Sequence, residues 1–96
     1  MMNSDTPFAI ITGTSRGIGA EYARMLARQG YNLLLISRDE NQLIQFSREL
    51  EADCGIQASI GILDLAKPGS AHELFAIARN YRKAPDILIN LSLIHI

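Results

Sequence analysis

The sequence predicts an α/β fold in which a parallel sheet carries helices on both faces. Short apolar runs of strand length alternate with amphipathic stretches of helical spacing from residue 8 to residue 90. Such regular alternation is typical of parallel strands joined by right-handed helical crossovers. A glycine-rich turn lies between the first apolar run and the first amphipathic stretch. The expected element order is βαβαβαβ.

The apolar runs define the expected strands. Residues 8–12 form a continuous apolar run, which suits a strand buried on both faces of a parallel sheet. Residues 32–37 form a second strand of the same kind. In residues 56–63 the apolar positions mostly alternate, so one face of that strand should be less buried. The last strand is expected at residues 87–90.

The helices are expected between these strands. The first should begin near Gly17 and end before Gly30, which suits a left-handed cap. The second should begin after Asp39, three residues before Gln42 in a capping-box arrangement, and end at Gly55. The expected apolar faces carry Ile18, Tyr22, Met25 and Leu26 in the first helix, and Leu43, Phe46 and Leu50 in the second.

A third helix is expected before the last strand. Pro68 suits its first turn, because the backbone N–H that proline lacks has no helical acceptor there. The inward-facing side chains of this helix are expected to be Leu74, Ile77, Ala78 and Tyr81.

Composition and charge exclude several classes of protein. With 96 residues, 48% of them hydrophobic and 20% charged, the chain fits one small packed domain. Its net charge of −1, without a basic cluster, gives no reason to expect nucleic acid or an anionic membrane as a partner. The single cysteine, Cys54, cannot form an internal disulfide. No apolar run reaches membrane-spanning length and the polar N-terminus lacks signal-peptide features, so a soluble, cytoplasmic protein is expected.

The turn after the first strand has the features of a phosphate-binding site. A phosphate needs backbone N–H donors and a positive potential, and a helix N-terminus offers both where no Cβ atom blocks the approach. Gly13 can turn the chain out of the strand, Gly17 allows close approach, and Gly19 leaves room for the helix to pack. Hydroxyl groups that can donate to phosphate or stabilise the turn come from Thr12, Thr14 and Ser15.

The glycine spacing by itself is a weak signal. G-x-x-x-G-x-G differs from the G-x-G-x-x-G dinucleotide fingerprint, and no Gly-Lys-Ser/Thr follows as a P-loop requires. A purely structural tight turn is the alternative. The position of the turn, between the first buried strand and the first helix, favours phosphate binding.

The segment Thr12-Gly13-Thr14-Ser15-Arg16-Gly17-Ile18-Gly19 resembles the T-G-x-x-x-G-x-G signature of the short-chain dehydrogenase/reductase family. The resemblance implies that residues 1–90 are part of an NAD(P)-binding Rossmann domain, the N-terminal half of a doubly wound parallel sheet. It also implies that the chain is an N-terminal fragment of an oxidoreductase. The cofactor-binding residues that it implies are Thr12, Gly13, Thr14, Ser15, Arg16, Gly17, Ile18, Gly19, Ser37, Arg38, Asp64, Leu65 and Asn90.

The end of the second strand predicts which nucleotide is bound. An acid there would accept hydrogen bonds from the ribose 2′-hydroxyl and repel a 2′-phosphate. Ser37 stands where NAD-dependent relatives carry Asp, Arg38 follows it, and Arg16 matches another basic position that the family uses for NADP. Two guanidinium groups suit a 2′-phosphate, so NADP(H) is expected. The alternative is a solvated Arg38 that pairs with Asp39 or Glu40.

Two further positions match the family. Asp64 follows the third strand and looks like the Asp that hydrogen-bonds the adenine edge. Capping of the following turn is a compatible structural role for it. Asn90 matches the first Asn of the N-N-A-G segment, which supports the central sheet near the cofactor.

The chain lacks the catalytic residues that the resemblance implies, a Ser and a Tyr-x-x-x-Lys pair. Lys67 and Lys83 are preceded four residues earlier by Leu63 and Arg79, so no tyrosine is placed to protonate an alkoxide. Neither a catalytic residue nor a metal site is predicted. The parent protein is expected to be a homo-oligomer that transfers hydride between nicotinamide and a carbonyl or alcohol substrate. A non-catalytic NADP-sensing or scaffold module is the alternative.

Residues 91–96 depart from the family pattern. Leu91-Ser92-Leu93 replaces the expected Asn-Ala-Gly, and the whole segment resembles the translation of a transposon-end adaptor used in sequencing libraries. We therefore expect these residues to be non-native, with a natural, divergent continuation of the strand as the alternative. A native codon run for Leu-Ser-Leu-Ile-His-Ile followed by a stop codon would contradict the adaptor hypothesis.

Overall fold

Strands and helices alternate along the chain in the predicted order. The computed structural model describes residues 6–13, 17–80 and 84–91. The elements are β1 (Phe8–Thr12), α1 (Ile18–Arg28), β2 (Asn32–Ser37), α2 (Glu40–Cys54), β3 (Ala58–Ile62), α3 (Ser70–Arg79) and β4 (Ile87–Asn90). The bounds of β1, β2 and β4 are those that the apolar runs predict.

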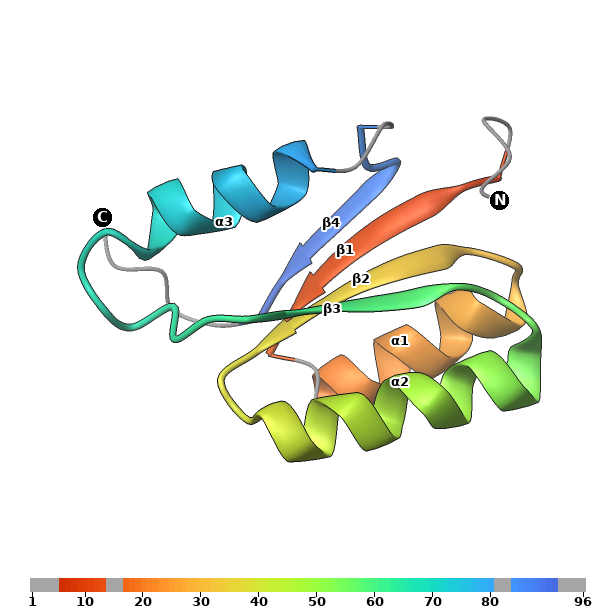
Figure 1. Cartoon of the computed structure of the whole chain (residues 1–96). Helices are drawn as coiled ribbons and strands as arrows, with labels where there is room; N and C mark the ends of the chain where they lie inside the picture. Colours follow the sequence, from red (N-terminus) through yellow and green to blue (C-terminus); the bar gives the residue numbers. More distant parts are fainter. Residues whose placement is uncertain (1–5, 14–16, 81–83, 92–96) are drawn as a thin grey trace.

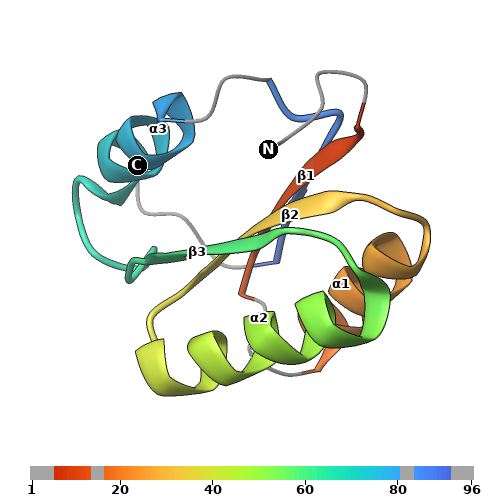
Figure 2. The ribbon, with the colours of Figure 1, turned by 45° about the vertical axis from the view of Figure 1, so that its right-hand side comes forward.

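The four strands form one parallel sheet in the order β3-β2-β1-β4. Helices α1 and α2 cover one face of this sheet, and α3 covers the other (Figures 1 and 2). The predicted α/β fold class is thereby confirmed. Since β1 pairs with β2 on one side and with β4 on the other, the strand order reverses at β1. Open α/β sheets bind ligands at the carboxyl ends of the strands beside such a reversal.

Two apolar cores lie on opposite faces of the sheet. Successive side chains of a strand point to opposite faces, so each central strand contributes to both cores. Strands β1 and β2 are buried at every position. The core against α1 and α2 includes Ala9, Ile11, Leu33, Leu35 and Phe46. The smaller core beneath α3 includes Phe8, Ile10, Leu34, Ile36 and Leu65.

The buried face of α1 differs from the prediction. Of the predicted apolar face, only Leu26 is buried. The other predicted members of that face, Ile18, Tyr22 and Met25, are exposed, with 68%, 39% and 44% of their surface accessible to solvent. The sheet is contacted instead by a face that carries the small residues Ala20, Ala23 and Ala27. Because alanine lets a helix approach the sheet closely, the bulkier apolar side chains are left on its outer flank.

The ends of α2 follow the prediction. The Asp39 carboxylate accepts a hydrogen bond from the Gln42 backbone N–H at 3.1 Å, which caps the helix N-terminus. Gly55 ends the helix in the left-handed conformation, with φ 70° and ψ 18°. Glycine takes this conformation without the steric cost that a Cβ atom imposes. The predicted buried residues Leu43, Phe46 and Leu50 are buried.

Two boundaries near β3 differ from the prediction. The strand covers 58–62 of the predicted 56–63. Helix α3 begins at Ser70 and excludes Pro68, because the intervening Gly69 has φ 83°, outside the helical region. The predicted inward residues Leu74, Ile77 and Ala78 are half-buried and pack from α3 against the smaller core. Tyr81 lies outside the described residues.

Candidate nucleotide-binding site

The carboxyl ends of β1, β2 and β3 enclose a hollow of about 320 Å³. The turn after β1 contributes Gly13, the end of β2 contributes Ser37 and Arg38, and the chain after β3 contributes Asp64 and Leu65. All of these were predicted as cofactor-binding residues, and the fold brings them together. The lining residues that the sequence reasoning missed are Ile36, Leu63 and Ala66. As apolar neighbours of the polar residues, they carry no separate signal in the sequence.

The backbone at the glycine turn fits an anion. Gly13 and Gly17 have φ values of 74° and 69°, which favour glycine. Gly17 immediately precedes α1, and among the described residues no side chain caps this helix N-terminus. A Cβ atom at Gly17 would meet nothing within 4 Å, so there is open space beside the backbone. The first N–H groups of a helix have no intrahelical acceptor and can donate to a phosphate.

Three residues of the predicted turn, Thr14, Ser15 and Arg16, lie outside the described residues. The role of Arg16 as a second cation for a 2′-phosphate therefore stays a prediction. Gly19 is buried in the first turn of α1, in line with its expected role in close helix packing.

Ser37 and Arg38 stand beside the hollow at the end of β2. The Ser37 hydroxyl oxygen accepts a hydrogen bond from the Asp39 backbone N–H at 3.3 Å, so its own hydrogen can point to another acceptor. Arg38 is exposed. Within the described part of the chain the ion pair is that of Arg24 with Glu21, so Arg38 does not pair with either acid that follows it. Its guanidinium can bind an external anion in bidentate fashion.

Asp64 follows β3 and lines the same hollow. Its Oδ1 accepts a hydrogen bond from the Ala66 backbone N–H at 3.0 Å, and its carbonyl accepts one from the Lys67 N–H at 3.2 Å. Asp64 therefore stabilises the turn that follows it, and a carboxylate has further lone pairs for an amino group. Leu65 is buried in the core beneath α3, which holds the backbone beside Asp64 in place.

Thr12 and Asn90 join the carboxyl ends of β1 and β4. The Thr12 hydroxyl donates to Oδ1 of Asn90 at 2.7 Å and accepts from the Leu91 N–H at 3.2 Å. Both residues were predicted to contact the cofactor. They lie next to each other in the sheet, where the strand order reverses, and neither lines the strand-end hollow.

A larger hollow runs along the outer flank of α1. Its lining includes Gly17, Ile18, Tyr22 and Met25, and the part of it that the structure describes comes from this helix and the residue before it. Ligand sites combine apolar walls with polar groups that converge from several elements. The strand-end hollow fits this description, because its lining residues come from the ends of three strands. The predicted residues Gly17 and Ile18 border the α1 hollow instead.

The strand-end hollow can recognise a ligand with both an anionic group and a hydrogen-bond donor. Among its lining residues, Ser37 and Arg38 can donate hydrogen bonds and Asp64 can accept them. The described ranges contain no group of His, Cys, Asp or Glu side chains that could hold a metal ion. They also contain no helix long and apolar enough to span a bilayer.

These features define an α/β protein with a candidate nucleotide site at the carboxyl ends of its strands. A family model described as short chain dehydrogenase matches residues 7–92. The chain therefore belongs to the short-chain dehydrogenase family, and the resemblance noted in the glycine turn is confirmed.

Individual relatives agree with this membership. The chain is 46% identical over 59 residues to the very-long-chain 3-oxoacyl-CoA reductase of Kluyveromyces lactis, a match that covers 62% of the chain and 17% of the relative. It matches the alcohol dehydrogenase from the archaeon Thermococcus sibiricus complexed with 5-hydroxy-NADP, with TM-score 0.79 and 35% identity, over 85% of the chain and 35% of that protein. It also matches L-sorbose reductase from Gluconobacter frateurii complexed with NADPH and L-sorbose, with TM-score 0.83 and 29% identity. This match covers 91% of the chain and 33% of that protein. The chain thus spans 17% to 35% of the length of these relatives.

Proposed function

We propose that the chain is the NADP(H)-binding part of an oxidoreductase that transfers hydride between nicotinamide and a carbonyl or alcohol carbon. The observation that carries the proposal is the convergence of Gly13, Ser37, Arg38 and Asp64 on one hollow at the strand ends. The end of β2 carries a hydroxyl and a guanidinium where an acid would favour NAD. The NADP-type ligands of the two solved relatives support the same choice.

Different residues would hold different parts of the nucleotide. The N-terminus of α1, after Gly17, would bind the pyrophosphate through backbone N–H groups. Ser37 and Arg38 would bind the 2′-phosphate, with Arg16 as a further cation. Asp64 would accept a hydrogen bond from the adenine amino group. When bound, the nicotinamide ring supplies the hydride chemistry.

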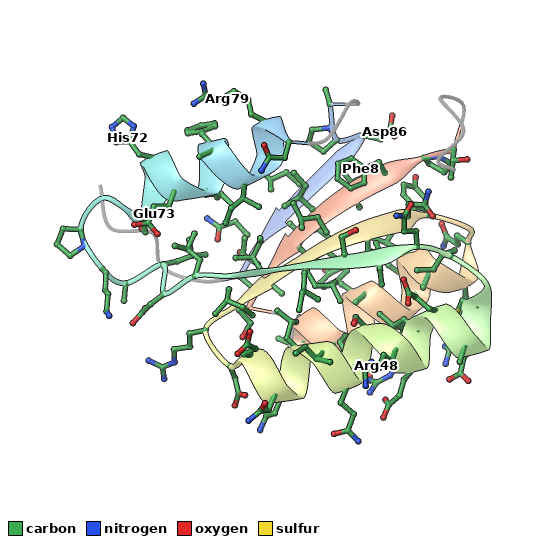
Figure 3. The ribbon with its side chains drawn as sticks, viewed as in Figure 1. Phe8, Arg48, His72, Glu73, Arg79 and Asp86 are labelled. Carbon is green, nitrogen blue, oxygen red and sulfur yellow. The ribbon has the colours of Figure 1, made fainter. Side chains whose placement is uncertain are left out.

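The proposal is tested by titrating the chain with NADPH and with NADH. We expect weak but preferential binding of NADPH. Arg38→Ala should weaken NADPH binding by about ten- to a hundredfold, the value of a charge-assisted hydrogen bond, and leave NADH binding unchanged. Arg48→Ala is the matched control, because Arg48 is an exposed arginine on α2, away from the hollow (Figure 3). Equal affinity for the two nucleotides, or an Arg38→Ala protein that binds as the Arg48→Ala protein does, would contradict the proposal.

A non-catalytic NADP-sensing or scaffold module would bind the nucleotide in the same way. The reading frame that follows the Asn90 codon at the source locus separates the two functions. A Ser and a Tyr-x-x-x-Lys pair there would support the oxidoreductase, and a frame without them would support the module. The same sequencing tests the adaptor hypothesis for residues 91–96. The cytoplasmic location and the homo-oligomeric parent stay predictions.

A further inference from the structure

Ser70 is a buried polar residue that the proposed function does not use. It is the first residue of α3 and is 1% exposed. Its hydroxyl donates a hydrogen bond to the Leu65 carbonyl at 3.0 Å, and its backbone N–H donates to the Lys67 carbonyl at 3.2 Å. Ser70 thus connects α3 to the loop after β3 by two hydrogen bonds, of which the side chain makes one.

That loop forms one wall of the strand-end hollow. Asp64 and Leu65 line the hollow, and Asp64 stabilises the turn through the backbone N–H groups of Ala66 and Lys67. These bonds shape the turn from within. The bonds from Ser70 attach the turn to the helix. Because buried carbonyl groups need a hydrogen-bond partner, the Ser70 hydroxyl determines where the Leu65 backbone can lie at low energy.

Ser70 also lines a neighbouring hollow that shares a wall with the first. Arg38, Leu63 and Asp64 belong to the lining of both. Glu73, one turn further along α3, borders the neighbouring hollow on the side of the helix nearer the loop (Figure 3). A shift of the α3 N-terminus relative to β3 would therefore change the position of Asp64 with respect to Arg38.

We propose that Ser70 is a positioning residue for the adenosine end of the nucleotide. Its hydroxyl holds the Leu65 backbone and thereby sets the direction of the Asp64 carboxylate in the hollow. The inference rests on the proposed function, since Asp64 has an adenine edge to recognise only if the nucleotide binds there. Ser70 itself touches the loop, and its effect on the ligand passes through Asp64.

The test compares Ser70→Ala with Ser47→Ala, which serves as a matched control. Ser47 is 7% exposed and its hydroxyl donates to the Ile44 carbonyl at 2.9 Å within α2, away from the hollow. Each variant loses one hydroxyl hydrogen bond to a backbone carbonyl, which is buried at Ser70 and partly buried at Ser47, so losses of stability of similar size are expected. The probe is adenosine 2′,5′-bisphosphate, the adenosine end of NADP. Ser70→Ala should weaken its binding by roughly three- to tenfold, the value of one neutral hydrogen bond, whereas Ser47→Ala should bind as the parent does.

Two further measurements separate positioning from general destabilisation. Ser70→Thr keeps the hydroxyl and should bind the bisphosphate as the parent does. Hydrogen exchange at the Ala66 and Lys67 amides should be faster in Ser70→Ala than in Ser47→Ala, while exchange in β1 and β2 stays equal. Equal binding by folded Ser70→Ala and Ser47→Ala would overturn the positioning role and leave the proposed function intact. A parent chain that binds neither the bisphosphate nor NADPH would overturn the proposed function and this inference with it.

Discussion

The two strands that flank β1 differ sharply in burial. Strand β2 is buried at all of its positions, whereas β4 alternates between half-buried and exposed residues. Both pair with β1 in parallel, so the difference comes from what lies on their other sides. Strand β2 has β3 beside it and helices on both faces, while β4 is at the edge of the described sheet. An apolar edge strand of this kind favours pairing with another chain.

The strand-end hollow lies on the well-packed side of the sheet, because its lining residues come from the ends of β1, β2 and β3. Strand β4 is tied to that side through the Thr12–Asn90 hydrogen bond and the ladder with β1. We therefore expect substitutions around β2 to affect stability strongly and substitutions on β4 to affect it weakly.

The largest expected effect on stability is a difference between two leucines that lie on either side of the same residue. Leu34 in β2 and Leu88 in β4 both pair with Ile10 and share one face of the sheet. Leu34 is fully buried and Leu88 is 59% exposed. Leu34→Ala should lower the free energy of unfolding by about 3 kcal/mol, and Leu88→Ala by less than about 1 kcal/mol. Urea unfolding followed by circular dichroism measures both free energies. Equal losses in the two variants would contradict the expected difference between β2 and β4.

A smaller effect is expected where α3 packs on β3. A Cβ atom at Gly61 would lie 2.7 Å from Cδ1 of Ile36 and 3.3 Å from Cγ2 of Ile77. Since Ile36 is fully buried, its side chain has little space to move, and Gly61→Ala should destabilise the fold by about 1–2 kcal/mol. Ile36→Val removes the Cδ1 methyl group. In urea unfolding, the double variant should lose less free energy of unfolding than the sum of the losses in Gly61→Ala and Ile36→Val. Additive losses would show that this contact is not the cause.

The smallest effect concerns the connection between β1 and β4. Thr12→Val keeps the shape of the side chain and removes the hydroxyl that bonds to Asn90 and Leu91. The expected loss of unfolding free energy is about 1 kcal/mol for the two bonds together, since a hydrogen bond contributes roughly 0.5–1.5 kcal/mol net. Native-state hydrogen exchange should locate the change at the Leu91 amide, with the β2 amides unaffected. Unchanged protection of Leu91 would mean that the two strands are held together by their backbone ladder alone.

The sequence predicts the backbone well because local interactions decide it. The apolar runs give the bounds of β1, β2 and β4, and the Asp39 cap and Gly55 delimit α2. The buried face of α1 could not be predicted in the same way. Which flank of a helix meets a sheet depends on how closely the helix approaches distant strands, and the small residues Ala20 and Ala23 permit an approach that hydrophobic periodicity does not reveal.

For the candidate site, the sequence predicts several lining residues but not the side-chain hydrogen bonds around them. Ser37, Arg38 and Asp64 were identified from the resemblance to the short-chain dehydrogenase/reductase family. The fold brings them together because the carboxyl ends of parallel strands lie at one edge of the sheet. Specific side-chain hydrogen bonds depend on packing that no local pattern encodes. The bond between Thr12 and Asn90 joins residues 78 positions apart. The bond from Ser70 to Leu65 depends on the way Gly69 turns the chain into α3.

The most direct test of the NADP(H) assignment is the nucleotide preference of Ser37→Asp beside the parent. A carboxylate at the end of β2 would repel a 2′-phosphate and accept hydrogen bonds from a 2′-hydroxyl. Dissociation constants for NADPH and NADH should be measured at one ionic strength, because salt screens exposed charges. We predict that the parent prefers NADPH and that Ser37→Asp prefers NADH. A Ser37→Asp protein that kept the NADPH preference of the parent would contradict the assignment of the 2′-phosphate to this hollow.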